Sequence, residues 1–357
     1  MVYGHGGDIY TYEDMMDFSV NINPLGPSER VVDAAKRGVE QMAAYPDSRC
    51  RKLREKLSKR QGVPEEAYIF GNGAADLIYT LVLAEKPRRA LLPVPAFSEY
   101  EQALRTSDCH IRYYYTEQKN FFCVSESFLS EITEEVDIVF LCSPSNPSGH
   151  KIGKSLLLEI AGQCEKFGVR MVVDECFIEF LTDQEEHFMP GMLKRYRQLF
   201  LVRAFTKAHA MPGLRLGYGI TSDYELIEKM ESSRQPWSVS IPAQTAGLAA
   251  LDDRERIGRM RKLVAKERER IENQLRNMEI EFIPSDANFI LLYSDINLFD
   301  ELKNYNILIR DCSNYRGLGK GWYRIAVRTE KENDCLIKAI KEIVSRNFSD
   351  RNREDVR

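Results

Sequence analysis

Short, continuous apolar runs alternate with amphipathic helical stretches through most of the chain, and this alternation limits the fold more than any other feature. The runs have the length of buried strands and cover residues 68–70, 90–93, 111–115, 138–142, 171–173, 199–202 and 216–220. Helical stretches at 75–85, 98–105, 154–167 and 224–231 separate several of them. Strands that are apolar along their whole length are typical of a parallel sheet, because helices cover both of its faces. We therefore predict an α/β fold with a mostly parallel sheet covered by helices.

The pattern changes after Pro236 and Pro242. A charged helix near residues 253–277 leads to further strands near 279–283, 289–293, 307–310 and 322–328, and a last helix begins at Glu330. This order predicts a second, smaller α+β unit, and a chain of 357 residues suits roughly two domains. The predicted division is an N-terminal arm (1–27), a helix that packs with the small domain (28–45), a large domain (46–236) and a small C-terminal domain (237–357).

Composition and charge exclude several classes of protein. The chain has 50 Lys and Arg against 54 Asp and Glu, a net charge of −4, and no block of one sign that could serve as a nucleic-acid tail. The longest nearly apolar run, residues 77–84, is interrupted by Thr80 and is far shorter than the roughly 20 residues of a membrane helix. No signal-peptide pattern begins the chain, and its 8 cysteines are scattered without a C-x-x-C pair. We expect a cytoplasmic protein with reduced thiols and with no metal, membrane or nucleic-acid partner.

Two turns at strand ends carry candidate binding groups, because ligands of an open α/β sheet bind beyond the carboxyl ends of its strands. Residues 71–76 (Gly-Asn-Gly-Ala-Ala-Asp) join a strand to a helix, and their glycines let backbone N–H groups surround an anion at the helix N-terminus. A turn of this kind is structural as often as it is functional. Residues 143–149 hold Asn146 between two prolines, where its amide can bond a ligand oxygen. The alternative for this segment is a stiff turn without a ligand.

Two charged residues follow other strands of the same sheet, and a third comes soon after them. Asp174 comes directly after an apolar run, so it needs a partner or carries a large desolvation cost. A cationic ring nitrogen is one such partner, and a capped loop is the alternative. Lys207 also follows a strand, and a lysine in a buried, cation-rich cleft has a lowered pKa and can form a Schiff base. Arg215 lies eight positions further on and can bind phosphate through two parallel hydrogen bonds.

These segments form one ordered set at strand ends: the glycine-rich turn, Phe97, Asn146, Asp174, Thr206-Lys207 and Arg215. The set resembles the pyridoxal 5′-phosphate site of the fold-type I aminotransferase superfamily (class I and II), and the resemblance covers essentially the whole chain. It implies that Lys207 is the catalytic residue, which binds the cofactor as a Schiff base and later transfers a proton. It also implies that Asp174 pairs with the ring nitrogen and keeps it protonated, which sustains the cofactor as an electron sink.

The resemblance assigns the other cofactor contacts residue by residue. Asn146 would bond the phenolic oxygen, and Phe97 would stack on the ring. The implied phosphate contacts are the amides of Gly73 and Ala74 together with Thr206 and Arg215. Tyr45, in Tyr45-Pro46-Asp47, matches a tyrosine that reaches the phosphate of the neighbouring subunit. This match implies an obligate homodimer with shared active sites.

Two branches of the superfamily fit the chain: the threonine-phosphate decarboxylases of cobalamin biosynthesis and the histidinol-phosphate aminotransferases. Residues 5–9 (His-Gly-Gly-Asp-Ile) resemble the H-G-G-x-I of the decarboxylase branch, and residues 17–26 resemble its D-F-S-x-N-I-N-P-L-G. Residues 88–90 and 95–100 are also closer to the decarboxylases. Aminotransferases commonly carry Tyr where this chain has Phe177, so a hydroxyl that bonds the phenolic oxygen is missing here.

Two arginines indicate the class of substrate. Arg310 and Arg324 match cationic positions that bind the substrate's phosphate and carboxylate in these families. A buried arginine without an anion is costly, so a substrate with two anionic groups suits the pair. The implied substrate contacts are His5, Gly6, Asn21, Asn146, Arg310 and Arg324. His209 stands where relatives often have an aromatic residue, and we interpret it as a partly buried structural histidine.

The chain is therefore predicted to be a pyridoxal-phosphate lyase. It would decarboxylate O-phospho-L-threonine, or O-phospho-L-serine, to an aminoalkyl phosphate for cobalamin biosynthesis. The alternative is an aminotransferase of the histidinol-phosphate type that uses 2-oxoglutarate and glutamate. The bond broken at Cα is the one perpendicular to the cofactor ring, and the sequence leaves this rotation open. A regulator that has lost catalysis is disfavoured, because Lys207 is intact and no DNA-binding extension is present.

Overall fold

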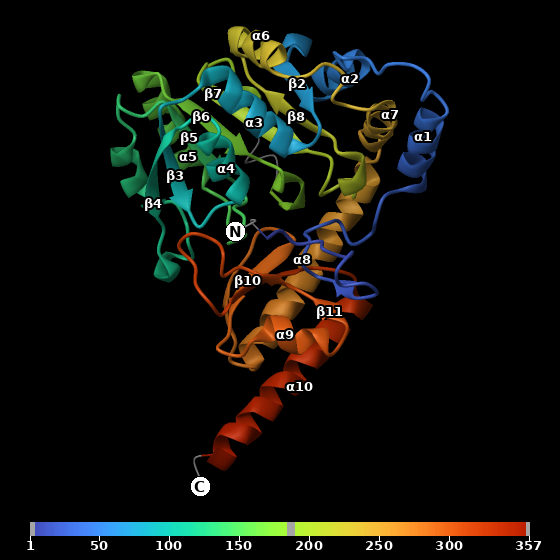
Figure 1. Ribbon diagram of the computed structural model, residues 1–357, viewed down its shortest axis with the longest axis vertical. Helices are drawn as coiled ribbons and strands as arrows, with labels where there is room; N and C mark the ends of the chain where they lie inside the picture. Colours follow the sequence, from blue (N-terminus) through green and yellow to red (C-terminus); the bar gives the residue numbers. More distant parts are fainter. Residues whose placement is uncertain (1–3, 184–189, 355–357) are drawn as a thin grey trace.

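A seven-stranded sheet forms the centre of the larger part of the molecule (Figure 1). The computed structural model describes residues 4–183 and 190–354. The strands of this sheet are β2 (Tyr68–Gly71), β3 (Arg89–Val94), β4 (His110–Tyr115), β5 (Ile138–Cys142), β6 (Arg170–Asp174), β7 (Leu199–Ala204) and β8 (Gly217–Ile220). They lie in the order β2-β8-β7-β6-β5-β3-β4, in which β8 is antiparallel to both neighbours and the other pairs are parallel. This arrangement confirms the predicted α/β fold.

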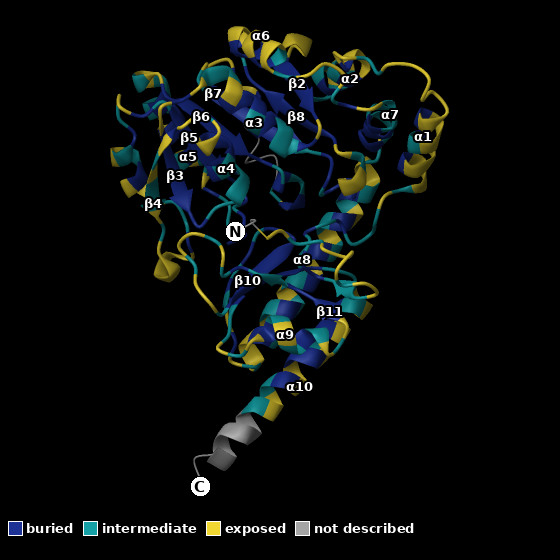
Figure 2. Cartoon of the chain, viewed as in Figure 1, coloured by how far each residue is buried: buried dark blue, intermediate teal, exposed yellow. Residues whose placement is uncertain are grey.

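Helices cover both faces of this sheet. Successive residues of a strand point to opposite sides, and in these strands the residues on both sides are apolar. In β5, Val139 and Leu141 belong to one apolar cluster, whereas Ile138 and Phe140 belong to another. The helices over the first cluster are α2 (Arg51–Gln61), α5 (Lys154–Phe167) and α7 (Ile241–Ala250). Those over the second are α3 (Ala74–Glu85), α4 (Ser98–Arg105) and α6 (Tyr224–Ser233). Figure 2 shows the buried strands between helices whose outer faces are exposed.

The smaller part of the molecule contains an antiparallel sheet in the order β12-β13-β10-β9. Its strands are β9 (Glu281–Ile283), β10 (Phe289–Tyr293), β12 (Arg310–Asp311) and β13 (Trp322–Ala326). The helices of this part are α8 (Arg254–Asn277), α9 (Leu298–Lys303) and α10 (Glu330–Glu354). In the N-terminal arm, β1 (Met16–Asp17) pairs in parallel with β11 (Ile307–Leu308), which fastens the arm to the small part. The predicted α+β unit is thereby confirmed.

Two local features differ from the sequence analysis. The single strand expected over residues 307–310 is divided, because β11 pairs with the arm and β12 joins the small sheet, on either side of the buried Ile309. Helix α7 was also not predicted, because its small residues form no clear apolar stripe. There Ser240 caps the helix and Pro242 lies in its first turn, where a proline is tolerated.

Helix α1 (Glu29–Val39) lies along α7, and a glycine sets their separation. A Cβ atom at Gly38 would come within 2.6 Å of the Pro242 Cα, so a larger residue would push the helices apart. Val31 of α1 and Ala243 of α7 belong to an apolar cluster of the seven-stranded sheet. After α7, the first residue that belongs to the cluster of the small sheet is Ile257. The apolar clusters thus place α1 and α7 with the large sheet, and the domain boundaries at residues 45 and 236 stay predictions.

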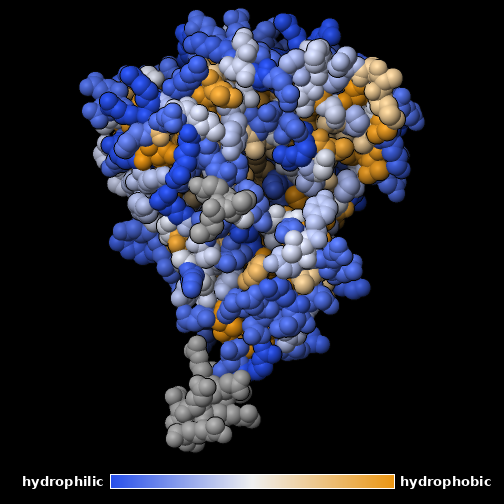
Figure 3. Space-filling view, viewed as in Figure 1, coloured by the Kyte–Doolittle hydropathy of each residue, from blue (hydrophilic) through white to orange (hydrophobic). Residues whose placement is uncertain are grey.

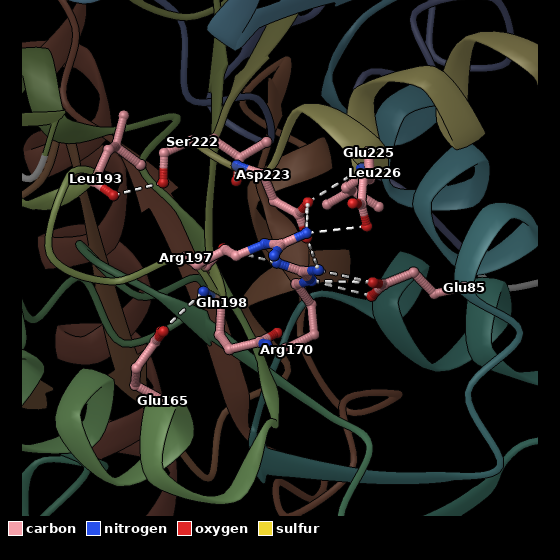
Figure 4. A network of polar contacts seen from close by, with 11 residues as sticks. Glu85, Glu165, Arg170, Leu193, Arg197, Gln198, Ser222, Asp223, Glu225 and Leu226 are labelled. Carbon is pink, nitrogen blue, oxygen red and sulfur yellow. Dashed lines mark hydrogen bonds and ion pairs between the residues drawn. The ribbon is translucent and has the colours of Figure 1, made fainter.

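A network of ion pairs fastens two helices to the amino end of β6 (Figure 4). Arg170, the first residue of β6, is buried and donates to Glu85 at the end of α3 (2.9 Å) and to Asp223 (2.8 Å), which caps α6. Arg197 donates to the second oxygen of Asp223 at 3.1 Å. Asp174 is the last residue of the same strand. The network therefore holds α3 and α6 at the end of the strand opposite to Asp174.

The surface exposes apolar side chains over α1 and α7 (Figure 3). The exposed apolar residues in or near these helices are Val32, Val39, Met42, Tyr45 and Trp237. Over residues 4–183 and 190–354, none of the helices is long and apolar enough to cross a membrane. Within these same ranges, no three His, Cys, Asp or Glu side chains gather as a metal site.

Candidate active site

The candidate site forms where four strands end at the same edge of the large sheet. Asp174 is the last residue of β6, Asn146 follows β5, and Lys207 follows β7. Gly73 follows β2 and caps α3. Strand β2 runs in the same direction as β7, since both are antiparallel to β8, so its carboxyl end faces the same edge. The topology therefore brings together the predicted groups that are far apart in the sequence.

Asp174 is held by two hydrogen bonds within the protein. Its carboxylate accepts a bond from the Tyr100 hydroxyl at 2.7 Å and another from the Cys176 backbone N–H at 2.9 Å. Burial raises the pKa of Tyr100 well above its usual value, so this hydroxyl stays protonated and donates. Tyr100 itself stacks on Phe140, with ring centres 5.3 Å apart. The capped loop considered for Asp174 is therefore present, and the fixed carboxylate can still accept a bond from a cationic ring nitrogen.

Lys207 lies among the charged groups that the sequence analysis singled out. Burial, together with the positive charges of Arg324 and Arg215, lowers the pKa of Lys207 to about 8. Asp174 acts on the same amine in the opposite direction. The Lys207 Nζ lies 5.9 Å from the centre of the Phe177 ring. A lysine with this pKa holds a substantial fraction of neutral, nucleophilic amine near neutral pH.

Gly73 and Arg215 form a compact cradle at the start of α3. Gly73 has a φ of 86°, and a Cβ atom there would come within 2.4 Å of Arg215 Nη2. A Cβ at Gly217 would come within 2.7 Å of the backbone nitrogen of Ala74. Thr206 is buried next to Lys207. A guanidinium beside a helix N-terminus is suited to an anion such as phosphate, so these residues fit the phosphate end of the expected cofactor.

Asn146 and Arg324 connect the two sheets. Arg324 is buried on β13, donates through Nη1 to the Asn146 side-chain oxygen, and donates through Nη2 to the Ser19 carbonyl at 3.0 Å. Its Nε is buried with no hydrogen-bond partner among the described residues, and no carboxylate there pairs with it. A buried guanidinium of this kind indicates a place for an anionic ligand.

The N-terminal arm closes the same region. Arg310 stands opposite Arg324 in the β12–β13 pair, so both side chains lie on one face of the small sheet. Arg310 donates to the Gly4 carbonyl. His5 reaches across to the large part, where its Nε2 lies 3.1 Å from Glu99. Asn21 is buried, and its side-chain oxygen has no partner among the described residues.

The arm needs a glycine at position 6. A Cβ atom there would come within 2.3 Å of the Ser19 carbonyl oxygen. Next to it, the Gly7 N–H donates to the Ser19 hydroxyl at 2.7 Å. At the other side of the site, the edge of Phe97 meets the Tyr100 ring, with ring centres 5.7 Å apart, and the His5 ring lies 6.3 Å from Phe97. His5 and Phe97 therefore lie close together, and Gly6 packs against Ser19, whose carbonyl accepts from Arg324.

Tyr45 is the predicted site residue that lies apart from this group. Its side chain is 79% exposed and packs on Trp237, with ring centres 4.6 Å apart. His209 is buried and lies 3.4 Å from Glu179, and burial lowers its pKa, as suits a structural histidine. Phe177 packs on Phe289 at 5.0 Å, so the position that commonly holds a tyrosine is part of the apolar core.

Comparison with known proteins agrees with this geometry. The sequence model of the family described as aminotransferase class I and II matches residues 13–340. The chain belongs to this family. Its members are pyridoxal 5′-phosphate enzymes, and this chain is such an enzyme. The resemblance found in the sequence is thus confirmed.

Individual relatives represent both branches considered above. The threonine-phosphate decarboxylase of Salmonella typhimurium is 34% identical over 353 residues, which are 96% of this chain and 96% of that protein. Histidinol-phosphate aminotransferase 2 of Archaeoglobus fulgidus is 31% identical over 335 residues, 93% of this chain and 94% of its own. The crystal structure of the histidinol-phosphate aminotransferase from Clostridium acetobutylicum superposes with a TM-score of 0.86 at 29% identity and covers 92% of this chain and 99% of that one. The crystal structure of L-threonine-O-3-phosphate decarboxylase from Porphyromonas gingivalis superposes with a TM-score of 0.81 at 26% identity and covers 92% of this chain and 99% of that one. Structures from both branches thus share this fold, so backbone shape alone does not separate their reactions.

Proposed function

We propose that this enzyme decarboxylates O-phospho-L-threonine, or its close relative O-phospho-L-serine, to an aminoalkyl phosphate used in cobalamin biosynthesis. The observation that carries the proposal is the pairing of Arg310 and Arg324 on one face of the small sheet, with Arg324 buried and lacking a carboxylate partner among the described residues. Two adjacent cations suit a substrate with both a phosphate and a carboxylate. The arm residues 5–9 and 17–26 and the 34% identity with a threonine-phosphate decarboxylase support the choice of reaction.

The residues around the cofactor take the roles that the resemblance implies. Bound pyridoxal 5′-phosphate supplies an electron sink for the charge that develops at the substrate Cα. Lys207 Nζ holds the cofactor and returns a proton to Cα, for which its lowered pKa is suited. Asp174 binds the ring nitrogen, Asn146 the phenolic oxygen and Phe97 the ring face. The phosphate contacts are Gly73, Ala74, Thr206 and Arg215.

The substrate contacts would decide which bond at Cα breaks. Arg324 would bind the substrate carboxylate and, with the arm, hold it in the orientation from which CO₂ leaves. Arg310 binds the phosphate, and His5, Gly6 and Asn21 close over the substrate. The second candidate is a histidinol-phosphate type aminotransferase, in which Lys207 removes the proton at Cα instead. The 31% identity with such an enzyme favours keeping it as the alternative.

The proposed enzyme is a cytoplasmic homodimer with shared sites and has no membrane or nucleic-acid partner. Tyr45 of each subunit would reach the cofactor phosphate bound by the other. The exposed Tyr45–Trp237 pair and the apolar surface over α1 and α7 support this assembly, because a monomer would leave these aromatic side chains in water.

A product assay separates the two reactions. Purified holoenzyme is incubated with O-phospho-L-threonine with and without 2-oxoglutarate, and a Lys207→Ala variant serves as the inactive control. We expect CO₂ and aminopropanol phosphate in equal amounts, independent of the oxo acid. Glutamate formed from histidinol phosphate and 2-oxoglutarate, without CO₂ from phosphothreonine, would establish the alternative.

A further inference from the structure

The segment 312–321 connects β12 to β13 and reaches from the small part of the molecule to the large part. Arg316 in this segment donates to both carboxylate oxygens of Glu101 on α4, from Nε at 3.2 Å and from Nη2 at 3.0 Å. Its guanidinium also lies over the Tyr113 ring of β4, 4.1 Å from the ring centre. One side chain of the small part is thus held by two side chains of the large sheet and its covering helix.

The ion pair has the features of a strong contact. Burial opposes ionisation of Glu101, but the hydrogen bonds and charge of Arg316 outweigh it and lower the pKa of the carboxyl. The carboxylate is therefore charged at neutral pH and is largely shielded from water. A two-point bond between a guanidinium and a shielded carboxylate fixes direction as well as distance, which a lysine at position 316 could not do.

Tyr315, the neighbouring residue, points into the candidate active site. Its hydroxyl lies 3.3 Å from the Asn146 side-chain oxygen and 3.5 Å from Arg324 Nη1. Burial raises the pKa of Tyr315, so the hydroxyl stays protonated and donates to Asn146. The guanidinium carbon of Arg310 lies 5.5 Å from the centre of the same ring. Tyr315 therefore contacts both substrate arginines and the asparagine assigned to the phenolic oxygen.

We propose that Tyr315 is a positioning residue, which fixes Asn146, Arg310 and Arg324 relative to one another and is itself held in place by the Arg316–Glu101 pair. Its ring lies beside the Arg310 guanidinium, and its hydroxyl shares the Asn146 oxygen with Arg324. The spacing of the two cations then sets the distance between carboxylate and phosphate that the site accepts. The proposal rests on the proposed function for the substrate contacts, but its effect on Asn146 can be measured without substrate.

The test compares holoenzyme variants that remove each contact singly and together. Tyr315→Phe keeps the ring and removes the hydroxyl, Arg316→Gln removes the ion pair, and the double variant removes both. Arg105→Gln is the matched control, because Arg105 also pairs with Glu101 but lies on the same helix α4 and does not connect the two parts. For each protein, kcat and KM for O-phospho-L-threonine are measured separately. The pH titration of the bound cofactor's visible absorption is recorded without substrate, and thermal unfolding reports folding.

We expect KM to rise about 3- to 10-fold in Tyr315→Phe, as suits the loss of one hydrogen bond, with a smaller change in kcat. Arg316→Gln should raise KM as well, and the double variant should show less than the product of the two effects, because both act through Tyr315. The midpoint of the absorption titration should move in both single variants and stay unchanged in Arg105→Gln. Unaltered KM and midpoint in Tyr315→Phe, or fully independent effects in the double variant, would overturn the proposal.

The two readouts separate this proposal from the proposed reaction. If wild-type holoenzyme fails to turn over phosphothreonine, the reaction is wrong, and the absorption titration alone decides the role of Tyr315. If turnover is present and Tyr315→Phe leaves both KM and the titration unchanged, the reaction stands and the positioning role fails. If Tyr315→Phe lowers the unfolding temperature, Tyr315→Leu takes its place, because it also lacks the hydroxyl, does not titrate and has the same expected direction.

Discussion

At the scale of single residues, burial determines what the charged groups of the site can do. Lys207 lies near the guanidinium groups of Arg324 and Arg215, and burial together with these charges lowers its pKa from the usual 10.5 to about 8. Arg324, by contrast, is buried without a carboxylate partner among the described residues. An amine with a lowered pKa beside such a guanidinium suits a site for an anionic amino acid.

We expect the lysine's pKa to be visible in cofactor binding. In protein stripped of its cofactor, the rate at which free pyridoxal 5′-phosphate combines with Lys207 should rise with pH around a midpoint near 8, because only the neutral amine attacks. Arg324→Met should raise this midpoint, since a nearby positive charge is removed. Stopped-flow absorbance follows the reaction. A wild-type midpoint near 10, or none of the expected increase in the variant, would contradict this explanation.

Sequence patterns identify several residues of this site but not every residue that orients them. Lys207, Asp174 and Asn146 stand at the ends of apolar strands, so their position at the edge of the large sheet could be predicted. Arg324 lies within a strand, and only the family resemblance indicated it. Tyr100 holds Asp174 across 74 residues of sequence, and no local pattern shows this contact. Its one visible signal is the spacing of three from Phe97, which places both on one side of a helical turn.

At the scale of the elements, the turn between β2 and α3 is limited by its glycine. Gly73 combines a positive φ with a close approach of the Arg215 side chain, whereas Gly62, at the end of α2, has a φ of 69° and open space around it. A comparison of substitutions at Gly73 and Gly62 therefore separates the effect of a positive φ from the effect of a crowded Cβ position. The alternation of apolar runs and helical stretches allowed the large sheet to be predicted. It did not predict α7, because tertiary packing, and not hydrophobic periodicity, stabilises this helix.

Gly73→Ala should weaken cofactor binding by at least about 10-fold, because its methyl group displaces Arg215 from the anion cradle in addition to straining the turn. Gly62→Ala, the matched control, should lower stability by about 1 kcal/mol and leave cofactor affinity unchanged. Equilibrium titration of stripped protein with pyridoxal 5′-phosphate gives both affinities. Equal affinities in the two variants would show that Arg215 does not need the space above Gly73.

We expect the ion pairs around Arg170 to affect the stability of the fold and not the binding of cofactor or substrate. Asp223→Ala removes a cap of α6 and a partner of the buried Arg170, so the free energy of unfolding should fall by about 3 kcal/mol or more. Glu225→Ala breaks only the exposed pair with Arg197 and should cost less than about 1 kcal/mol. Urea denaturation measures both values.

The acid dependence of this effect has a definite sign. Burial raises the pKa of Asp223, but hydrogen bonds from Arg170 and Arg197 outweigh this and lower it below the usual 3.8. The stabilisation is therefore complete above pH 3.8 and is lost as the pH falls through the lower value. The difference between wild type and Asp223→Ala should shrink in acid, and a difference that grows there would contradict the role of the ion pairs.

At the scale of the whole molecule, the candidate site is assembled from segments far apart in the chain. Its candidate residues are His5 and Asn21 of the arm, Asp174 and Lys207 at the large sheet, and Arg324 of the small sheet. Two contacts with α4, from His5 to Glu99 and from Arg316 to Glu101, join the arm and the small part to the large part. Which segments lie together depends on the topology of the two sheets. The candidate residues could therefore be predicted from the sequence, but the distances between them could not.

The proposed shared site predicts complementation between two defective subunits. Tyr45→Ala should lower cofactor affinity roughly 10-fold, in line with the loss of a hydrogen bond to a charged phosphate, and Lys207→Ala should be inactive. In a mixed dimer, the intact Lys207 of one subunit would receive Tyr45 from the other, so mixing should restore wild-type affinity in one of the two sites. Tyr224→Ala, an exposed tyrosine on α6, is the control. Cofactor titration of the mixture that shows no component with wild-type affinity would contradict shared sites.

The pairing of β1 with β11 has a consequence for synthesis of the protein in the cell. Met16 and Asp17 leave the ribosome long before their partners Ile307 and Leu308 are made. Until then the first segment has no strand to pair with, although the seven strands of the large sheet are already complete. Contacts between such distant parts of a chain form slowly. The nascent large domain can therefore fold before the arm is fixed, and the contacts proposed between the arm and the substrate can form only after residues 307 and 308 have been made.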